Sequence, residues 1–178
     1  TMLIGHDVNG KHVLEPSAGS GSILNHINSL GGITSACELN KELAEIIKGK
    51  AKFLRHDFLE LTKEESSHFD FIIMNPPFSQ DDKHILHAWE IAPEGCTIIS
   101  LCNWETLDNK YTSRRTRIGS LIANNGNKRN LENCFSTSER KTDVEVGMVT
   151  LFKPGSKSDF GDYFDMGPDE IEEQANGL

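Results

Sequence analysis

The chain has 178 residues, of which 37% are hydrophobic and 25% charged, and its formal net charge is −9. This length and composition predict one globular domain, and no apolar run approaches the length of a membrane span. The N-terminus lacks the basic and apolar stretches of a secretory signal, so we expect a cytoplasmic protein.

Strands and helices are expected to alternate along the chain. Residues 12–16 are predicted to form a buried strand, followed by a helix at 22–30, a strand at 33–38 and a helix at 40–50 with Asn40 as its N-cap. Further strands are expected at 51–58, 69–74 and 95–102, and helices near 81–92 and 112–126. Residues 131–136 and 144–153 are predicted to close the fold as an antiparallel hairpin.

This alternation predicts an α/β fold: a doubly wound, mostly parallel sheet with helices on both faces and a C-terminal antiparallel hairpin. We expect residues 1–153 to form this domain. Residues 154–178 hold one Lys against seven acidic residues and few apolar ones, which predicts an acidic, flexible tail.

The charge is distributed unevenly. The last 25 residues carry a net charge of −6, so a charge of only −9 + 6 = −3 is left for residues 1–153. The overall acidity argues weakly against a nucleic-acid partner, because phosphates are bound by Lys and Arg. The segments 110–117 and 128–129 are nevertheless basic, so a local surface for nucleic acid is compatible with the sequence.

No metal site or disulfide is expected. The four Cys show no CxxC spacing, and Cys37, Cys96 and Cys102 lie in apolar runs, which favours buried thiols. The seven His show no metal-ligand spacing, and we interpret His84 and His87 as part of a helix surface.

The first strand leads into the loop LEPSAGSGSI, residues 14–23. Gly19 and Gly21 allow the backbone to approach a ligand, and the helix that follows offers free N–H groups to a carboxylate or phosphate. A dinucleotide-binding loop needs a third glycine where this chain has Leu24, which counts against NAD. Glu15 would repel a pyrophosphate and could instead hold an ammonium group.

Two further acids follow at strand ends. Glu38 can accept hydrogen bonds from the two hydroxyls of a ribose, and Asp57 can accept one from an adenine amino group. Phe58 can pack on the adenine ring. A single acid at a strand end is usually a solvated loop residue, but three acids around a glycine loop indicate a site for S-adenosylmethionine.

The corner Asn75-Pro76-Pro77-Phe78 follows the apolar run FDFIIM. Two consecutive prolines cannot continue a strand, so the corner is rigid. The side-chain oxygen of Asn75 and the carbonyl of Pro76 can each accept one N–H of a planar amine and aim its lone pair at a methyl donor. Phe78 would stack on the target base. The alternative is a proline-stiffened turn with Phe78 in the core.

The motifs VLEPSAGSG, CELN, HDFL and NPPF, in this order, resemble those of the class I S-adenosylmethionine-dependent methyltransferases, and more narrowly the amino-group DNA methyltransferases that modify adenine. The resemblance covers about residues 11–153, and NPPF is its most specific part. The sequence RKTDVEVGMVTLFKP is also similar to the last hairpin of bacterial and phage relatives. The resemblance implies a Rossmann-like methyltransferase fold and a target base that leaves the DNA duplex.

The resemblance also implies two sets of site residues. The catalytic set is Asn75, Pro76, Pro77 and Phe78. The cofactor-binding set is Glu15, Pro16, Ser17, Ala18, Gly19, Gly21, Glu38, Leu39, Asp57, Phe58 and Asn75.

The expected function is therefore transfer of a methyl group to the 6-amino group of adenine in DNA. A chain of this size leaves little surface for reading a sequence, so we expect a separate target-recognition domain or subunit. Thr1 in place of an initiating Met indicates a trimmed or partial chain. Two alternatives stay open: a methyltransferase for RNA bases or for a protein glutamine amide, and a non-catalytic cofactor-binding or partner subunit.

Overall fold

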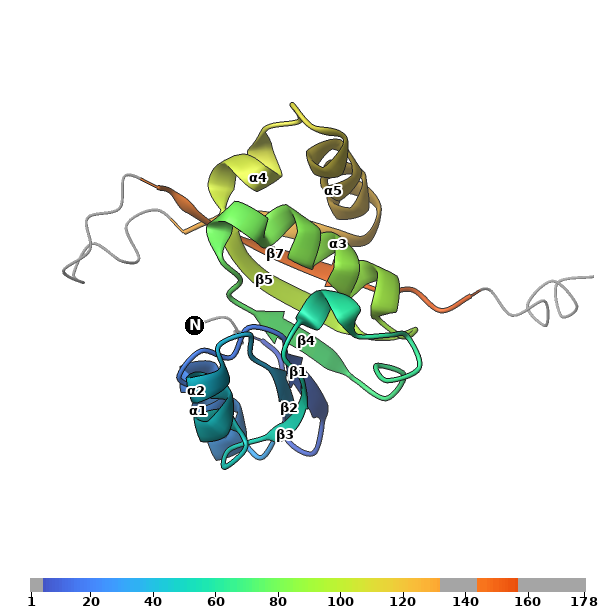
Figure 1. Cartoon of the computed structure of the whole chain (residues 1–178). Helices are drawn as coiled ribbons and strands as arrows, with labels where there is room; N and C mark the ends of the chain where they lie inside the picture. The colour runs from blue at the N-terminus through green and yellow to red at the C-terminus, as the bar shows by residue number, and fades with distance from the viewer. Residues whose placement is uncertain (1–4, 132–143, 157–178) are drawn as a thin grey trace, which may run out of the picture.

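The computed structural model describes residues 5–131 and 144–156, which form a seven-stranded sheet flanked by helices (Figure 1). The strands are β1 (His12–Glu15), β2 (Ile33–Cys37), β3 (Lys52–Arg55), β4 (Phe71–Met74), β5 (Thr97–Asn103), β6 (Gly126–Asn130) and β7 (Val146–Phe152). Their order across the sheet is β3-β2-β1-β4-β5-β7-β6. Strands β1 to β5 are parallel, and β7 is antiparallel to both of its neighbours.

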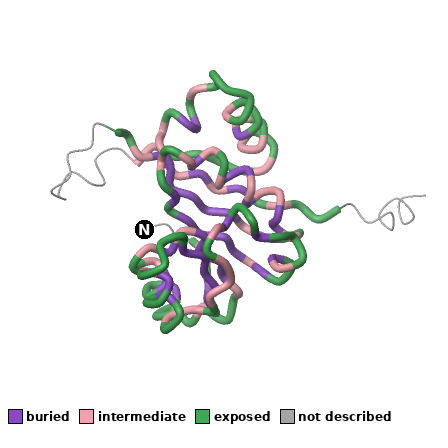
Figure 2. The backbone as a smooth tube through the Cα atoms, viewed as in Figure 1, coloured by how far each residue is buried: buried purple, intermediate pink, exposed green. Residues whose placement is uncertain are grey.

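Helices cover both faces of this sheet. They are α1 (Ser22–Ser29), α2 (Lys41–Ile47), α3 (Asp81–Ile91), α4 (Trp104–Asp108) and α5 (Ser113–Asn125), with short 3-10 helices η1 (Phe58–Glu60) and η2 (Phe78–Gln80). The core divides accordingly: Leu14 packs with Ile85 of α3, while its neighbour Val13 packs with Ile27 of α1 on the opposite face. Figure 2 shows buried residues running along the central strands. Burial on both faces explains why these strands are nearly continuous apolar runs.

The order of the strands reverses at β1. The chain passes from β1 to β2 and β3 on one side and then returns to β4 on the other side of β1. In open α/β sheets, ligands bind at the carboxyl ends of the strands beside such a reversal. The topology therefore directs attention to the segments that follow β1, β2, β3 and β4.

The predicted α/β architecture is confirmed, and each strand and helix predicted between residues 12 and 126 is present, with ends that differ by a few residues. The predicted N-cap is also correct: the Asn40 side-chain oxygen accepts hydrogen bonds from the Glu42 and Leu43 N–H groups at 2.9 and 3.1 Å. These bonds satisfy two of the free donors at the start of α2.

The antiparallel strands expected at the C-terminal side are present. Strand β6 pairs with β7 at Gly126–Asn130, directly after α5, and this strand is not predicted from the sequence. A Cβ atom at Gly126 would lie 2.0 Å from the Thr150 carbonyl oxygen, so glycine lets the backbone of β6 approach β7. Residues 132–136 of the predicted strand and 157–178 of the predicted tail lie outside the described residues.

The three cysteines Cys37, Cys96 and Cys102 are buried free thiols, as predicted, and Cys134 lies outside the described residues. Burial raises the pKa of Cys37 to about 12, so this thiol is neutral at physiological pH. Within residues 5–131 and 144–156, no group of three or more His, Cys, Asp or Glu side chains could hold a metal ion.

None of the helices in the described part of the chain is long and apolar enough to cross a membrane.

Candidate functional site

An open cleft of about 680 Å³ lies where β1, β2, β3 and β4 end. It brings together ten of the fourteen site residues predicted from the sequence. The lining residues are Pro16, Ser17, Gly19, Glu38, Leu39, His56, Asp57, Phe58, Leu59, Asn75, Pro76, Pro77, Gln80 and His84. The predicted residues Glu15, Ala18, Gly21 and Phe78 are not among them, and their positions are described below.

The glycine loop is held by its own backbone. The Ala18 N–H donates to the Cys37 carbonyl at 3.2 Å, and the Gly21 N–H donates to the Ala18 carbonyl at 2.8 Å. Gly19 and Gly21 have φ angles of 53° and 86°, a region in which glycine is least strained. Because Ala18 and Gly21 are buried, they shape the loop, whereas Gly19 faces the cleft.

Glu38 ties the loop to the end of β2. One of its carboxylate oxygens accepts a hydrogen bond from the Gly19 N–H at 2.7 Å, and the other accepts one from the Asn40 N–H at 2.8 Å. Each oxygen has a further lone pair, so the fixed carboxylate can accept two more hydrogen bonds from the cleft. Leu39, which is 72% exposed, adds an apolar wall beside it. This arrangement suits a ribose with vicinal hydroxyls next to a flat ring.

Glu15 lies beneath the loop, and only 1% of its surface is exposed. Its Oε2 atom is buried and has no hydrogen-bond partner among the residues that the structure describes. Desolvation raises the pKa of this carboxyl to about 8; the Leu24 N–H lowers it and the charge of Glu38 raises it further. A buried acceptor without a donor is costly, and an ammonium group is a donor that would satisfy it. Glu15 therefore fits the role of an ammonium partner.

The raised pKa of Glu15 predicts a pH dependence of stability. In the folded protein without ligand the carboxyl stays protonated up to about pH 8, whereas in the unfolded chain it ionises near its ordinary pKa of 4.5. Between these values only the folded state keeps the proton, so the free energy of unfolding falls as pH rises. We expect Glu15 to contribute a fall of about 3 kcal/mol between pH 5 and 7.5.

Urea denaturation of the wild type and of Glu15→Gln at several pH values measures this contribution. The Gln side chain has a similar shape and does not ionise, so the variant should lose this part of the pH dependence. Equal slopes for the two proteins would show that Glu15 titrates normally.

Asp57 follows β3 by two residues and is the N-cap of η1. Its Oδ1 atom accepts a hydrogen bond from the Leu59 N–H at 2.9 Å, and the residue lines the cleft. Phe58 also lines the cleft, but it is only 2% exposed and belongs to the core. The bond from an adenine amino group to Asp57 and the packing of adenine on Phe58 stay predictions.

The corner after β4 lies on the opposite side of the same cleft. Asn75 is exposed, Pro76 is buried and Pro77 is exposed, and all three line the cleft. The Pro77 carbonyl accepts a hydrogen bond from the Gln80 N–H at 2.9 Å, which turns the chain into η2. Phe78 is half-buried in η2 and is not a lining residue, so its stacking on a target base stays a prediction.

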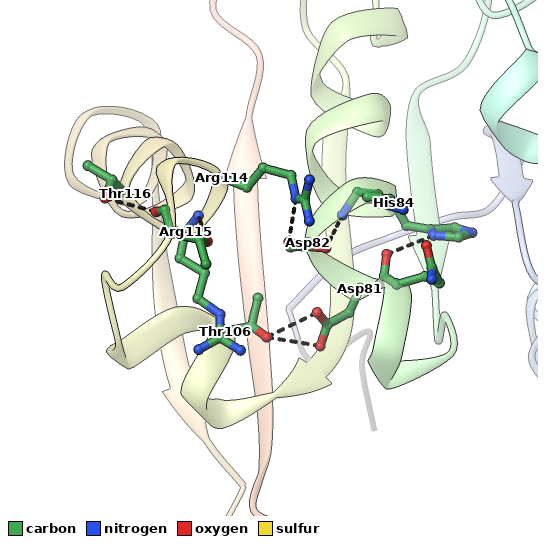
Figure 3. Close-up of polar contacts among 10 residues, drawn as sticks. Asp81, Asp82, His84, Thr106, Arg114, Arg115 and Thr116 are labelled. Carbon is green, nitrogen blue, oxygen red and sulfur yellow. Dashed lines mark hydrogen bonds and ion pairs between the residues drawn. The ribbon is translucent and has the colours of Figure 1, made fainter.

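Two acidic residues at the start of α3, Asp81 and Asp82, fix the helix that follows this corner (Figure 3). They are called the Asp81 clamp below. Asp81 is 2% exposed and accepts hydrogen bonds from the Asn103 N–H at 2.8 Å and from the Thr106 hydroxyl at 3.0 and 3.2 Å. Burial raises the pKa of the Asp81 carboxyl. Beside it, Asp82 forms an ion pair with Arg114 at 2.6 Å. The start of α3 is therefore joined to the end of β5, to α4 and to α5.

The hydrogen bonds to Asp81 lead to a prediction about the free energy of unfolding. Asp81→Ala removes the acceptor for two buried donors, so we expect the free energy of unfolding to fall by about 2–4 kcal/mol. Thr106→Val removes only one donor and should cost about 1 kcal/mol. Urea denaturation measures both values, and an Asp81→Ala variant no less stable than Thr106→Val would show that Asp81 is not the common acceptor.

The interpretation of His84 and His87 as a helix surface is wrong. His84 lines the cleft, stacks on Phe58 with ring centroids 5.6 Å apart, and places Nδ1 2.9 Å from the Gln80 carbonyl. His87 meets the edge of the same phenyl ring at 4.9 Å, and its Nε2 lies 3.1 Å from the Leu61 carbonyl. Burial lowers the pKa of His87. The two imidazoles thus form part of the cleft and its support.

Comparisons with known proteins identify the fold. The sequence matches no protein-family model, and no curated protein matches it. Three solved structures illustrate the fold: a candidate RNA methyltransferase from Pyrococcus horikoshii (TM-score 0.57, 24% identity, 84% of this chain and 77% of that one), a predicted O-methyltransferase from Agrobacterium tumefaciens (0.61, 17%, 87% and 78%) and an RNA methyltransferase from Salinibacter ruber in complex with S-adenosylhomocysteine (0.57, 13%, 88% and 90%).

The chain thus has the Rossmann-like fold of these methyltransferase structures. The acidic residues at this edge of the sheet suit the chemistry of S-adenosylmethionine, although Glu15 lies outside the lining of the cleft. The unpartnered oxygen of Glu15 suits the ammonium group, the two-oxygen acceptor of Glu38 suits the ribose, and the carboxylate of Asp57 suits the adenine amine.

Proposed function

We propose that this chain transfers the methyl group of S-adenosylmethionine to the 6-amino group of adenine in DNA. The observation that carries the proposal is that Asn75 and Pro76 line the same cleft as Glu38 and Asp57. An amine held at the corner after β4 would thereby face a cofactor held at the ends of β1, β2 and β3. A target-recognition domain or subunit outside this chain is part of the proposal, because the described residues offer little surface for reading a sequence.

The chemistry of the corner suits an aromatic amine. The nitrogen of such an amine is a poor nucleophile, because its lone pair is delocalised into the ring. The Asn75 side-chain oxygen and the Pro76 carbonyl can each accept one of its N–H groups, which favours a tetrahedral nitrogen and directs its lone pair. Proline suits this position because its fixed φ keeps the carbonyl aimed and its missing N–H is not needed.

No strong general base is needed for this reaction. The cofactor supplies a methyl group activated by a positively charged sulfur. The amine proton becomes acidic only as the new bond forms, so it can pass to water afterwards. Most of the rate then comes from holding the amine in the right place, which the rigid corner and the Asp81 clamp allow.

Nucleic acid is favoured over protein as the substrate. Residues 109–131 contain six Lys and Arg and no Asp or Glu, although the whole chain has a net charge of −9. Such a basic stretch suits a polyanion better than a protein glutamine. RNA is the second candidate, because two of the solved neighbours bear the description RNA methyltransferase. The intact corner argues against a non-catalytic subunit, which would have no chemical need for it.

Transfer of a tritiated methyl group to duplex DNA, single-stranded DNA, RNA and protein in parallel, followed by nucleoside analysis, tests the proposal. We expect label in N6-methyldeoxyadenosine. A matched oligonucleotide in which purine replaces adenine lacks the amine and should stay unlabelled. Label only in RNA would support the second candidate, and label only in protein would contradict both.

A further inference from the structure

The loop between α4 and α5 presents an aromatic ring within a basic surface. Tyr111 is 89% exposed, the largest exposed fraction of any large hydrophobic residue in the described part of the chain. Lys110 precedes it, and Arg114 and Arg115 follow in the first turn of α5. These four residues are called the 110–115 surface below. Its composition is that of a site for a partner with both negative charge and flat rings.

The backbone around Tyr111 is braced. The Tyr111 N–H donates to the Asn109 side-chain oxygen at 3.0 Å, and the Thr116 hydroxyl donates to the Lys110 carbonyl at 3.2 Å. The Thr112 hydroxyl caps α5 by accepting a hydrogen bond from the Arg115 N–H at 3.2 Å. The loop therefore holds the phenol ring out in water, where the ring gains nothing from hydrophobic burial. An exposed aromatic on a fixed backbone is typical of a binding surface.

The 110–115 surface is joined to the proposed methyl-transfer site. Arg114 pairs with Asp82 in the first turn of α3, and Asp81 beside it accepts a hydrogen bond from Thr106 (Figure 3). Asp81 also accepts one from the Asn103 N–H. Helix α3 begins four residues after Pro77 of the corner. The two segments also follow β4 and β5, which are neighbouring parallel strands that end at the same edge of the sheet.

The positive charges available to a partner come mainly from Lys110 and Arg115. Arg114 is already paired with Asp82, whereas neither Lys110 nor Arg115 forms an ion pair with any described residue. Asp108, the last residue of α4, is the acidic residue nearest to this loop in the sequence, and it forms an ion pair with Lys128 at 2.8 Å. Two cations without an ion pair among the described residues, close in sequence to an exposed ring, suit a partner that carries both phosphates and bases. A duplex hides the faces of its bases, so the partner that fits is an unpaired strand.

We propose that the 110–115 surface binds the unpaired nucleic-acid segment beside the target nucleotide. Tyr111 stacks on one base, and Lys110 and Arg115 contact the phosphates that flank it. The inference rests on the proposed function and deepens it: the enzyme acts on a strand that is already unpaired or locally opened. The surface reads no sequence, because stacking and phosphate contacts accept any base.

Fluorescence anisotropy tests the surface with the whole chain, saturating S-adenosylhomocysteine and labelled 12-nucleotide probes of single-stranded DNA, single-stranded RNA and duplex DNA. Tyr111→Ala should weaken single-strand binding about tenfold, whereas Tyr111→Phe, which keeps the ring, should stay within about twofold of the wild type. Lys110→Ala and Arg115→Ala should each lower the slope of log Kd against log salt by about 0.7. Lys11→Ala, just before β1 at the opposite edge of the sheet, is the matched control and should change nothing.

Calorimetry with S-adenosylhomocysteine should give the wild-type affinity for every variant, which shows that the fold is intact. The proposal that the 110–115 surface binds an unpaired strand would be overturned in two cases. Either Tyr111→Ala binds single strands as tightly as the wild type does, or the wild type does not bind them. If Tyr111→Ala methylates DNA as well as the wild type does, the surface is wrong and the proposed function stands. If strands bind through Tyr111 but none is methylated, the surface stands and the proposed function fails.

Discussion

Replacing Asn75 with Ala is expected to lower the rate of methyl transfer by at least about 100-fold, because one of the two acceptors for the amine is lost. Asn75 also belongs to the predicted cofactor-binding set, but cofactor binding should stay largely intact, since Glu15, Glu38 and Asp57, the proposed partners of the ammonium, ribose and adenine groups, are unchanged. Single-turnover methyl transfer to DNA measures the rate, and calorimetry with S-adenosylhomocysteine measures the affinity.

Two variants serve as controls for Asn75→Ala. Asn75→Asp keeps one carbonyl-type oxygen as an acceptor, so it should retain more activity than the Ala variant. Gln80→Ala changes another polar side chain of the cleft to which no chemical role is assigned, and it should have a small effect. Full activity of Asn75→Ala would refute the amine-orienting role.

Replacing Glu38 with Ala is expected to weaken the binding of S-adenosylmethionine about 100-fold, which corresponds to the loss of two charge-assisted hydrogen bonds to a ribose. The carboxylate also anchors the Gly19 and Asn40 N–H groups, so the glycine loop loses its tie to β2 at the same time. Calorimetric titration gives the dissociation constant, and thermal unfolding of the free protein shows whether the fold survives.

The Glu38→Gln variant is a milder change. Its side chain keeps the shape and one oxygen, so one of the Gly19 and Asn40 N–H groups keeps its acceptor, and one acceptor for the ribose is lost. We expect an affinity between those of the wild type and Glu38→Ala. An unchanged affinity in both variants would remove Glu38 from the ribose site.

The strand-end residues could be predicted from the sequence because a parallel sheet brings its carboxyl ends to one edge. The motifs that contain Gly19, Glu38, Asp57 and Asn75 each follow an apolar run, and the topology alone is enough to assemble them. His56 and Leu59 also line the cleft and flank Asp57-Phe58 in the same motif, so the signal for them was present in the sequence.

Other features depend on contacts that no local pattern reveals. His84 faces the cleft because η2 sets where α3 begins and how it is rotated, which the polar sequence of that helix does not show. Asp81 meets donors 22 and 25 residues further along the chain, so its role as a clamp follows only from the packing of α3 beside β5. Strand β6 is a polar edge strand without the alternation that marks strands, and its pairing depends on the close approach that Gly126 allows.

Calorimetric titration of the folded protein with S-adenosylmethionine and S-adenosylhomocysteine tests the central claim most directly, because the proposed methyl transfer depends on a cofactor in this cleft. The account predicts that both molecules bind with one site per chain, that each raises the unfolding temperature, and that both effects are weaker in Glu38→Ala. Neither heat of binding nor a shift in unfolding temperature for the folded wild-type protein would contradict the account.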